Sequence, residues 1–281
     1  MIRARKRFGQ HFLEPAWVEK LVAAIDPRPD EAFLEIGPGR GALTRPLAAR
    51  ARSVVAYEID RDLARELRAT MPANVTVVEG DFLETPAPDT RHAAPDTRHQ
   101  HPAPSTQHPA PAEVRVAANL PYNVASPILF RLVDLYRGGL PLRDATVMLQ
   151  REVADRLVAE PGGKEYGVLT ILIRHAASVE RLFNLPAGAF RPAPKVLSSV
   201  VRLRFHAPHP PIADERAFAD LVQAVFTRRR KTIANALLAY DRTTALDPAT
   251  ALARADIDGR RRPETLAVAE LARLSDVFSS V

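Results

Sequence analysis

Residues 32–51 read AFLEIGPGRGALTRPLAARA, and this stretch decides the fold class. An apolar run at 32–36 leads into three glycines within five residues, and a segment rich in alanine and leucine follows at 42–51. The run has the length of a buried strand, the glycines indicate a tight turn, and the last segment predicts a helix. A strand that turns into a helix in this way begins a strand–helix–strand unit, so we expect a parallel sheet.

The same alternation continues toward the C-terminus. Asp60 stands where it can cap a helix that starts just after it. Two apolar runs at 178–183 and 198–205 lack a long helix between them and could close the sheet as an antiparallel hairpin. The pattern predicts an α/β fold with a parallel sheet covered on both faces. Strands are expected at 53–59, 75–82, 113–119 and 144–150, and helices at 62–71, 125–137 and 151–160.

The alternation is interrupted by a segment of different composition at 84–112. It contains seven prolines and four histidines, and the hexad APDTRH occurs in it twice. Such a segment cannot bury enough apolar surface to offset the entropy of ordering it, so we interpret it as a disordered insertion that does not affect function. Its histidines lack a fixed geometry and no cysteine accompanies them, so no metal site is predicted.

The C-terminal part has a different pattern. After a proline-rich joint at 206–211, residues 214–240 and 262–278 carry apolar side chains at three- and four-residue spacing. We therefore predict a catalytic domain at 1–207 and a small all-helical domain at 208–281. The run Arg228, Arg229, Arg230 and Lys231 is expected to lie on a helix of the second domain.

Composition narrows the class of protein. The chain has 281 residues, a net charge of +6 and no cysteine, which excludes disulfides and thiolate nucleophiles. Its pI of about 9.9 favours a polyanionic partner such as nucleic acid. Only 5 of the 39 basic residues are lysine, so the basic composition could equally reflect a GC-rich genome. No secretory signal or membrane-length apolar run is found, so we expect a soluble, cytoplasmic protein without a membrane partner.

Candidate site residues follow the ends of successive strands, where ligands bind in such sheets. Gly37, Gly39 and Gly41 let the backbone turn and a ligand approach. Glu58 ends the second strand and can accept bonds from ribose hydroxyls, as in both methyltransferases and nicotinamide dehydrogenases. Asp81 ends the third strand, where it can accept from an exocyclic amine, with Phe82 beside the adenine face. The carboxylates of Glu58 and Asp81, without a group that would bind a pyrophosphate, favour S-adenosylmethionine as the ligand. Taken alone, an Asp after a strand is more often a turn residue or a helix cap.

The fourth strand ends in Asn119-Leu120-Pro121-Tyr122, which resembles the motif of amino-group methyltransferases that act on nucleic-acid bases. The Asn119 side chain and the Leu120 carbonyl can accept the N6–H groups of an adenine and so direct the nitrogen lone pair at a methyl donor. Pro121 fixes the backbone. Tyr122 offers a face for stacking, worth about 1–3 kcal/mol per base. Taken alone these residues would more often form a turn.

Nearly the whole chain resembles the KsgA-type rRNA adenine dimethyltransferases. The resemblance implies a Rossmann-like class I S-adenosylmethionine-dependent methyltransferase with a helical C-terminal domain that binds rRNA. It implies transfer of four methyl groups to two adjacent adenines in a hairpin near the 3′ end of small-subunit rRNA, during maturation of the subunit. The motifs that carry it are RKRFGQHFL (5–13), EIGPGRGALT (35–44), YEIDRDLA (57–64), EGDFL (79–83), NLPYNVASPILF (119–130), MLQREVADRLVA (148–159), YGVLTIL (166–172), FRPAPKVLSSVVRL (190–203) and RRRKTIANAL (228–237).

The resemblance also implies roles for single residues. Phe190 matches the family's second aromatic residue, which would sandwich the flipped target base against Tyr122. His11 stands where an Asn is commoner, so the pH dependence of cofactor binding is expected to differ. The implied cofactor contacts are His11, Leu13, Gly37, Glu58, Asp81 and Asn119. Phosphate contacts are expected from Arg5, Lys6, Arg7, Arg228, Arg229, Arg230 and Lys231, although solvated charge is the usual reading of such runs.

Several alternatives remain open at this stage. The nearest is an antibiotic-resistance type of enzyme that methylates an adenine of large-subunit rRNA on the same fold. A ribosome-assembly factor that works by binding alone, a DNA adenine methyltransferase and a nicotinamide dehydrogenase are further possibilities. The predicted partner is small-subunit rRNA or the assembling small subunit, and the protein is expected to be a monomer.

Overall fold

The computed structural model describes residues 12–86, 113–241 and 246–280. Their contacts divide the chain into two compact units. The first comprises the described part of Met1–Arg151 together with Glu180–Arg204, and the second comprises Glu152–Val179 with the described part of Phe205–Val281. Within this described portion, no helix is long and apolar enough to cross a membrane.

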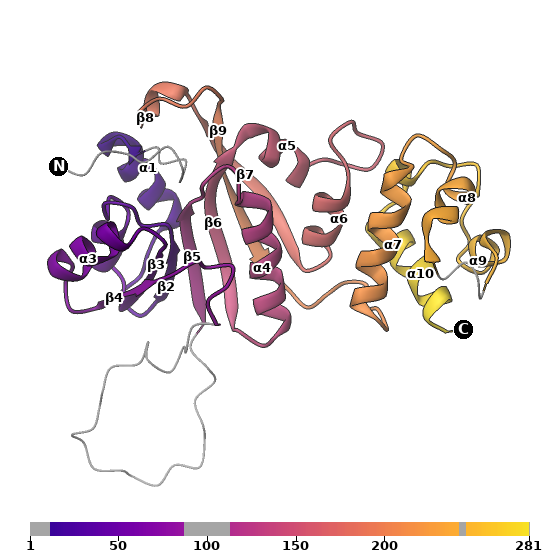
Figure 1. Cartoon of the computed structure of the whole chain (residues 1–281), viewed down its shortest axis with the longest axis horizontal. Coiled ribbons are helices and arrows are strands. Elements are labelled where there is room, and N and C mark those ends of the chain that lie inside the picture. The colour runs from indigo at the N-terminus through magenta and orange to yellow at the C-terminus, as the bar shows by residue number, and fades with distance from the viewer. Residues whose placement is uncertain (1–11, 87–112, 242–245, 281) are drawn as a thin grey trace, which may run out of the picture. The chain divides into compact units, whose positions relative to one another are not determined.

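A seven-stranded sheet forms the centre of the first unit (Figure 1). Its order is β4-β3-β2-β5-β6-β9-β7, in which β4, β3, β2, β5 and β6 are parallel neighbours and β9 pairs antiparallel to β6. The expected α/β fold is thus present, with an antiparallel strand inserted beside β6. The strands are β2 (Ala32–Ile36), β3 (Ser53–Glu58), β4 (Val75–Glu79), β5 (Val114–Asn119), β6 (Leu142–Gln150), β7 (Ala177–Leu185) and β9 (Ser198–Phe205).

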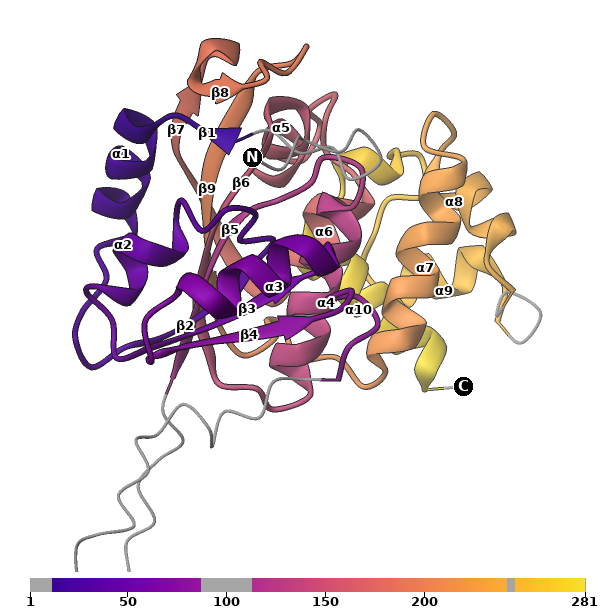
Figure 2. The ribbon, with the colours of Figure 1, turned by 60° about the vertical axis from the view of Figure 1, so that its left-hand side comes forward.

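The helices of this unit connect and cover the strands. Strands β4, β3 and β2 run side by side, with α3 alongside them (Figure 2). Asp60 caps α3 as predicted, because its side chain accepts from the backbone N–H groups of Asp62 and Leu63. The helices are α1 (Pro15–Ile25), α2 (Thr44–Ala48), α3 (Arg61–Thr70) and α4 (Ala125–Arg137). Helix α5 (Arg151–Leu157) starts at Arg151 and otherwise belongs to the second unit, which begins at Glu152.

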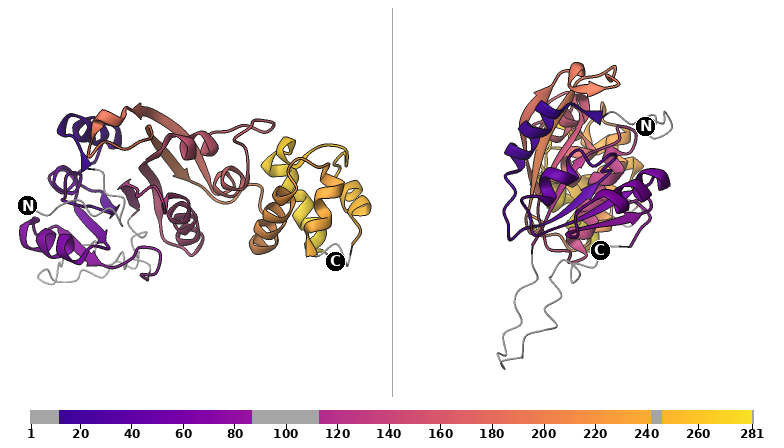
Figure 3. Two further views of the ribbon diagram at one scale, coloured as in Figure 1. Left: turned by 45° about the horizontal axis from the view of Figure 1, so that its top comes forward. Right: turned by 90° about the vertical axis from the view of Figure 1, so that its left-hand side faces the viewer.

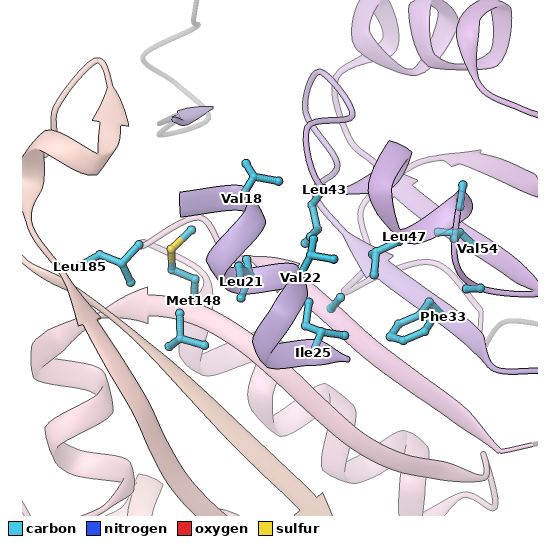
Figure 4. Close-up of a cluster of buried hydrophobic side chains, with 14 of the residues drawn as sticks. Val18, Leu21, Val22, Ile25, Phe33, Leu43, Leu47, Val54, Met148 and Leu185 are labelled. Carbon is cyan, nitrogen blue, oxygen red and sulfur yellow. The ribbon is translucent and has the colours of Figure 1, made fainter. Parts of the chain in front are cut away.

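A hydrophobic cluster lies between α1 and one face of the sheet. Figure 4 shows the apolar side of α1 facing side chains of α2 and the strands. Burial of each such aliphatic side chain contributes about 1.5–3 kcal/mol. Alternate residues of the central strands, such as Leu34 and Val116, are buried on the opposite face, so the sheet is covered on both sides as expected. The cluster includes Val18, Leu21, Val22, Ile25, Phe33, Leu43, Leu47, Val54, Met148 and Leu185.

A two-stranded ribbon joins the start of the described chain to a distant loop. Strand β1 (Phe12–Leu13) pairs antiparallel with β8 (Phe190–Arg191), in the register Leu13 to Phe190. The Glu14 N–H donates to the Ala189 carbonyl at 2.9 Å, and the Glu14 carboxylate lies 2.9 Å from the Arg191 guanidinium. The short 3₁₀ turn η3 (Ala187–Ala189) precedes β8.

The second unit is helical, and α7 to α10 pack together as a bundle (Figure 3). A segment from the middle of the chain belongs to this unit, since the Tyr166 hydroxyl donates to the Leu266 carbonyl at 2.8 Å and the His175 ring lies 4.9 Å from that of Phe218. The helices are α6 (Val168–Arg174), α7 (Glu215–Thr227), α8 (Ile233–Ala236), α9 (Pro248–Arg254) and α10 (Val268–Ser279), with 3₁₀ turns η4 (Leu237–Ala239) and η6 (Pro263–Thr265).

The predicted position of the basic run on a helix is wrong. Helix α7 ends at Thr227, and residues 228–231 form the turn that follows it. The reason is Thr232, whose side-chain oxygen accepts the Asn235 N–H and thereby caps a new helix, α8. The chain has to leave one helix before it enters the next, so the run occupies the connection.

Candidate active site

The parallel register brings four strand ends to one edge of the sheet. Ile36 of β2 pairs with Tyr57 of β3 and Ala118 of β5, so the residues that follow all three strands lie beside one another. Strand β4 ends level with β3, through the pair Glu58 and Glu79. A cavity of about 190 Å³ lies at this edge. Its wall includes ten of the predicted residues, namely Leu13, Gly37, Gly39, Glu58, Asp81, Phe82, Asn119, Leu120, Pro121 and Tyr122.

The loop after β2 adopts a backbone that only glycine accommodates easily. Gly37, Gly39 and Gly41 have φ angles of 70°, 60° and 77°, in the left-handed region. At Gly41 an added Cβ would also lie 2.3 Å from the terminal methyl group of Met71, in the C-cap of α3, and this flexible side chain would have to shift. The predicted turn is therefore confirmed, and Gly37 and Gly39 form part of the cavity wall.

Glu58 is buried and is held by the backbone around the cavity. Its Oε2 accepts the Gly39 N–H at 2.9 Å and its Oε1 accepts the Asp60 N–H at 2.9 Å. Burial raises the pKa of this carboxyl, and the two backbone hydrogen bonds offset part of that rise. A carboxylate has about four acceptor positions, so Glu58 can still accept from the hydroxyls of a ligand.

Asp81 and Phe82 lie in the turn after β4. The Oδ1 atom of Asp81 accepts the Leu83 N–H at 2.9 Å, so this residue closes its own turn while also forming part of the cavity wall. Phe82 is buried, and its ring meets that of Tyr57 edge to face at 5.4 Å between centroids. Asp81 can therefore stabilise its turn and also accept a hydrogen bond from a ligand in the cavity.

Glu35 was not anticipated from the sequence and is the most perturbed group at the site. It is 2% exposed and belongs to the cavity wall. In the part of the chain that is described, its Oε2 has no hydrogen-bond partner. Burial raises the pKa of Glu35 to about 8, with a smaller contribution from the charge of Glu58, while the Thr44 hydroxyl acts in the opposite direction. A bound cation would lower this pKa and favour the ionised form, so two buried carboxyl groups in one cavity wall suit a cationic ligand.

The tetrad Asn119–Tyr122 occupies the end of β5 and the turn that follows. Asn119 pairs with Met148 of β6, and the Leu120 N–H donates to the Met148 carbonyl at 2.9 Å, which extends the pairing by one residue. The Tyr122 hydroxyl lies 2.6 Å from that of Ser198, the first residue of β9. The backbone of the tetrad is thus fixed by the sheet, and its aromatic ring is anchored at the far end.

Phe190 does not lie where the family resemblance places it. Its side chain is 0% exposed and belongs to the hydrophobic cluster beneath α1, and it is not part of the cavity wall. The physical reason is the β1–β8 pairing, which places Phe190 opposite Leu13 and leads its ring into the core. Stacking of this ring on a target base therefore remains a prediction of the family resemblance, and the buried position of Phe190 does not support it.

Other predicted residues fall elsewhere. Arg5, Lys6, Arg7 and His11, and residues 87–112 of the expected insertion, lie outside the described residues. Among those that the structure does describe, no group of three or more His, Asp and Glu side chains could hold a metal ion.

In the second unit, the four basic residues 228–231 surround an open hollow of about 710 Å³ together with Leu238, which is 59% exposed. Arg229 is engaged within the unit, because its guanidinium contacts the Glu264 carboxylate at 2.6 Å and the Gly163 carbonyl at 3.2 Å.

Comparison with known proteins decides the family. A model of the ribosomal RNA adenine dimethylase family matches residues 1–278. The chain belongs to this family. It is 41% identical to the ribosomal RNA small subunit methyltransferase A of Acinetobacter baylyi, over 98% of this chain and 92% of that protein. It is also 41% identical to the protein of the same name from Nitrosococcus oceani, over 97% of this chain and 95% of the relative.

Solved structures give the same fold. A dimethyladenosine transferase from Plasmodium falciparum superposes with a TM-score of 0.73 at 24% identity, covering 94% of this chain and 96% of that one. The 23S rRNA methyltransferase ErmE superposes with a TM-score of 0.62 at 27% identity, covering 95% and 99%. The predicted class I methyltransferase fold, and membership of the rRNA adenine dimethyltransferases, are confirmed.

Proposed function

We propose that this dimethylase family member transfers methyl groups from S-adenosylmethionine to N6 of two adjacent adenines in a hairpin near the 3′ end of small-subunit rRNA, as a step in maturation of that subunit. The observation that carries the proposal is one cavity that joins an acidic wall, Glu35 and Glu58, to the tetrad Asn119–Tyr122. The relatives at about 40% identity, which are named for the small subunit, support the choice of substrate.

The acidic wall fits the proposed cofactor. When bound, S-adenosylmethionine supplies an electrophilic methyl group on a positively charged sulfur. Glu58 can balance that charge, and a bound cation would also favour the ionised form of Glu35, whose buried Oε2 has no partner in the described structure. Glu58 and Asp81 keep acceptor capacity for hydroxyl and amine donors.

The tetrad fits the other half of the reaction. The N6 lone pair of adenine is delocalised into the ring, and hydrogen bonds from N6–H to the Asn119 side chain and the Leu120 carbonyl pull the nitrogen toward tetrahedral geometry. These acceptors are preorganised, because β6 holds the backbone of both residues. No general base is required before transfer, since the nitrogen becomes acidic only after it is methylated.

The basic turn of the second unit supports binding of folded RNA. Arg230 and Lys231 are exposed, and within the described chain no ion pair engages either side chain. We assign phosphate contact to these two residues and a structural role to Arg229. The phosphate contacts of Arg5, Lys6, Arg7 and Arg228, the contact of His11 with the cofactor and the domain division at residue 207 remain predictions.

The test uses purified small and large ribosomal subunits that lack the dimethylation. Each is incubated with the protein and methyl-labelled S-adenosylmethionine, and the label is mapped to a base. Dimethyladenosine confined to small-subunit rRNA is the expected result. Label in large-subunit rRNA alone would favour the second candidate, an enzyme of the type of ErmE, which shares the fold. Binding of the cofactor without label on either subunit would indicate a binding factor.

A further inference from the structure

The hydroxyl pair Tyr122–Ser198 connects two distant parts of the chain at the cavity. The two oxygens are 2.6 Å apart and the residues are 76 positions apart in sequence. Ser198 is 0% exposed, and Tyr122 is half-buried in the cavity wall. A hydrogen bond at the end of a tyrosine ring fixes the place of the phenol oxygen and so restrains the first side-chain torsion. Because a phenol O–H lies close to the plane of its ring, the contact also favours ring orientations in which the Ser198 oxygen lies near that plane.

The position of Ser198 is itself determined by the sheet. In the antiparallel register of β6 and β9, Ser198 pairs with Gln150. Just before it, the Leu197 carbonyl accepts the Arg151 N–H at 2.9 Å. Strand β6 also holds the tetrad, through Met148. One strand therefore fixes both the backbone of the tetrad and the serine that anchors its ring.

We propose that Ser198 is a positioning residue for the target adenine, because its hydroxyl holds the Tyr122 ring in the orientation that stacks on the base. This inference rests on the proposed function. Ser198 acts through Tyr122 and need not touch the substrate. Burial raises the pKa of the Tyr122 phenol, so this group stays neutral and the hydroxyl pair is intact at neutral pH.

The neighbouring serine provides a matched control. Ser199 is equally buried, but it points to the other face of the strand, where its hydroxyl donates to the Asn184 side-chain oxygen at 2.7 Å. A Ser-to-Ala change at either position removes one buried hydroxyl and one side-chain hydrogen bond from β9. Only the change at position 198 removes the hydroxyl that contacts Tyr122.

The experiment measures kcat and KM for small-subunit rRNA, the dissociation constant for S-adenosylmethionine and the melting temperature. We compare the wild type with Ser198→Ala, Tyr122→Phe, the double variant and Ser199→Ala. A net contribution of one hydrogen bond corresponds to a roughly fivefold effect. We expect kcat/KM to fall about fivefold in Ser198→Ala and equally in Tyr122→Phe, without further loss in the double variant. Cofactor affinity should stay within twofold of wild type, and Ser199→Ala should keep its activity.

Several results would overturn the inference. One is wild-type activity in Ser198→Ala while Tyr122→Phe is impaired. Another is a double variant in which the two losses of kcat/KM multiply. A third is a loss of kcat/KM in Ser199→Ala as large as that in Ser198→Ala. Ser198→Thr, which restores the hydroxyl, should recover activity if positioning is the cause. If the wild-type protein does not label small-subunit adenines, the proposed function itself fails, and this is seen before any variant is compared.

Discussion

Buried carboxylates lie at both ends of the strands in the sheet, but their partners differ. Where β5 and β6 begin, the Arg115 guanidinium lies 3.0 Å from Asp144 and 2.7 Å from Glu31, and all three side chains are at most 10% exposed. Where β2 and β3 end, Glu35 and Glu58 form no ion pair with any other described residue. Paired charges at one edge of the sheet hold the fold together, whereas buried carboxyl groups without a counter-charge at the other edge identify the site where a ligand binds.

The sharpest test of this contrast is to remove the partner at the paired edge. Arg115→Ala removes the buried counter-charge of Asp144 and Glu31 and leaves them only the half-exposed Arg143, 2.9 Å from Glu31 and 3.9 Å from Asp144. The free energy of unfolding should fall by about 3 kcal/mol, the lower end of the range for a broken buried pair. Urea denaturation measures the effect. Arg28→Ala is the control, because its pair with Asp26 at 2.7 Å is mostly exposed and should contribute about 1 kcal/mol or less. Equal losses in the two variants would contradict the structural role of Arg115.

At the unpaired edge, the largest effect is expected on catalysis. Asn119→Ala removes one of the two acceptors for the adenine amino group, and kcat should fall by about 10²–10³-fold, as when a single preorganised polar group is lost. Calorimetry should show nearly unchanged S-adenosylmethionine affinity. Asn119→Asp keeps an acceptor oxygen and should retain more activity than the Ala variant. Methyl transfer by Asn119→Ala at a wild-type rate would exclude the mechanism.

The buried carboxyl group of Glu35 should affect how the free energy of unfolding depends on pH. Because its pKa is about 8 in the folded protein and 4.5 by reference, the folded state keeps a proton that the unfolded chain has lost. This group should therefore reduce the free energy of unfolding as pH rises from about 4.5 to 8, by at most about 1.4 kcal/mol per pH unit, with no further change above that range.

Glu35→Gln removes this titration, so the variant should become progressively more stable than wild type across the same interval. Chemical denaturation at several pH values between 5 and 9 measures the difference. A constant difference between the two proteins would show that Glu35 does not titrate in this window.

Paired and unpaired side chains also differ within the basic run 228–231, where substitutions should have the smallest effects. Arg230→Ala and Lys231→Ala should each weaken binding of a small-subunit rRNA hairpin and reduce the slope of log affinity against log salt by about one. Arg229→Ala breaks the contact with Glu264 and should mainly change stability, by about 1 kcal/mol or less, because the pair is partly exposed. Fluorescence anisotropy in a series of KCl concentrations distinguishes the two roles. A full change of slope in Arg229→Ala would reverse the assignment.

The elements with the strongest periodicity could be predicted from the sequence almost to the residue. Strand β2 and helix α4 have the bounds expected, 32–36 and 125–137. Helix α2 is shorter than expected, at Thr44–Ala48. Helix α1 was not predicted, although Pro15 at its start and Val18, Leu21, Val22 and Ile25 at helical spacing give a clear signal.

The candidate site was predictable to the extent that parallel strands align their ends. Gly37, Glu58, Asp81 and Asn119 reach one cavity for that reason. The rest depends on contacts between segments far apart in the sequence. Ser198 becomes part of the site only through the register of β9, and Phe190 is buried only because β8 pairs with β1. Local pattern contains no information about either pairing.

The β1–β8 ribbon has a consequence for how the enzyme is made. Leu13 of β1 contributes to the cavity wall, yet its partner strand begins at Phe190, after most of the chain has been synthesised. Ser198, which contacts the Tyr122 hydroxyl, emerges later still. Because domains form during translation from the N-terminus onward, the first strands can assemble early while this wall stays incomplete. A nascent chain of this rRNA-modifying enzyme should thus gain its methylation site only near the end of its own translation.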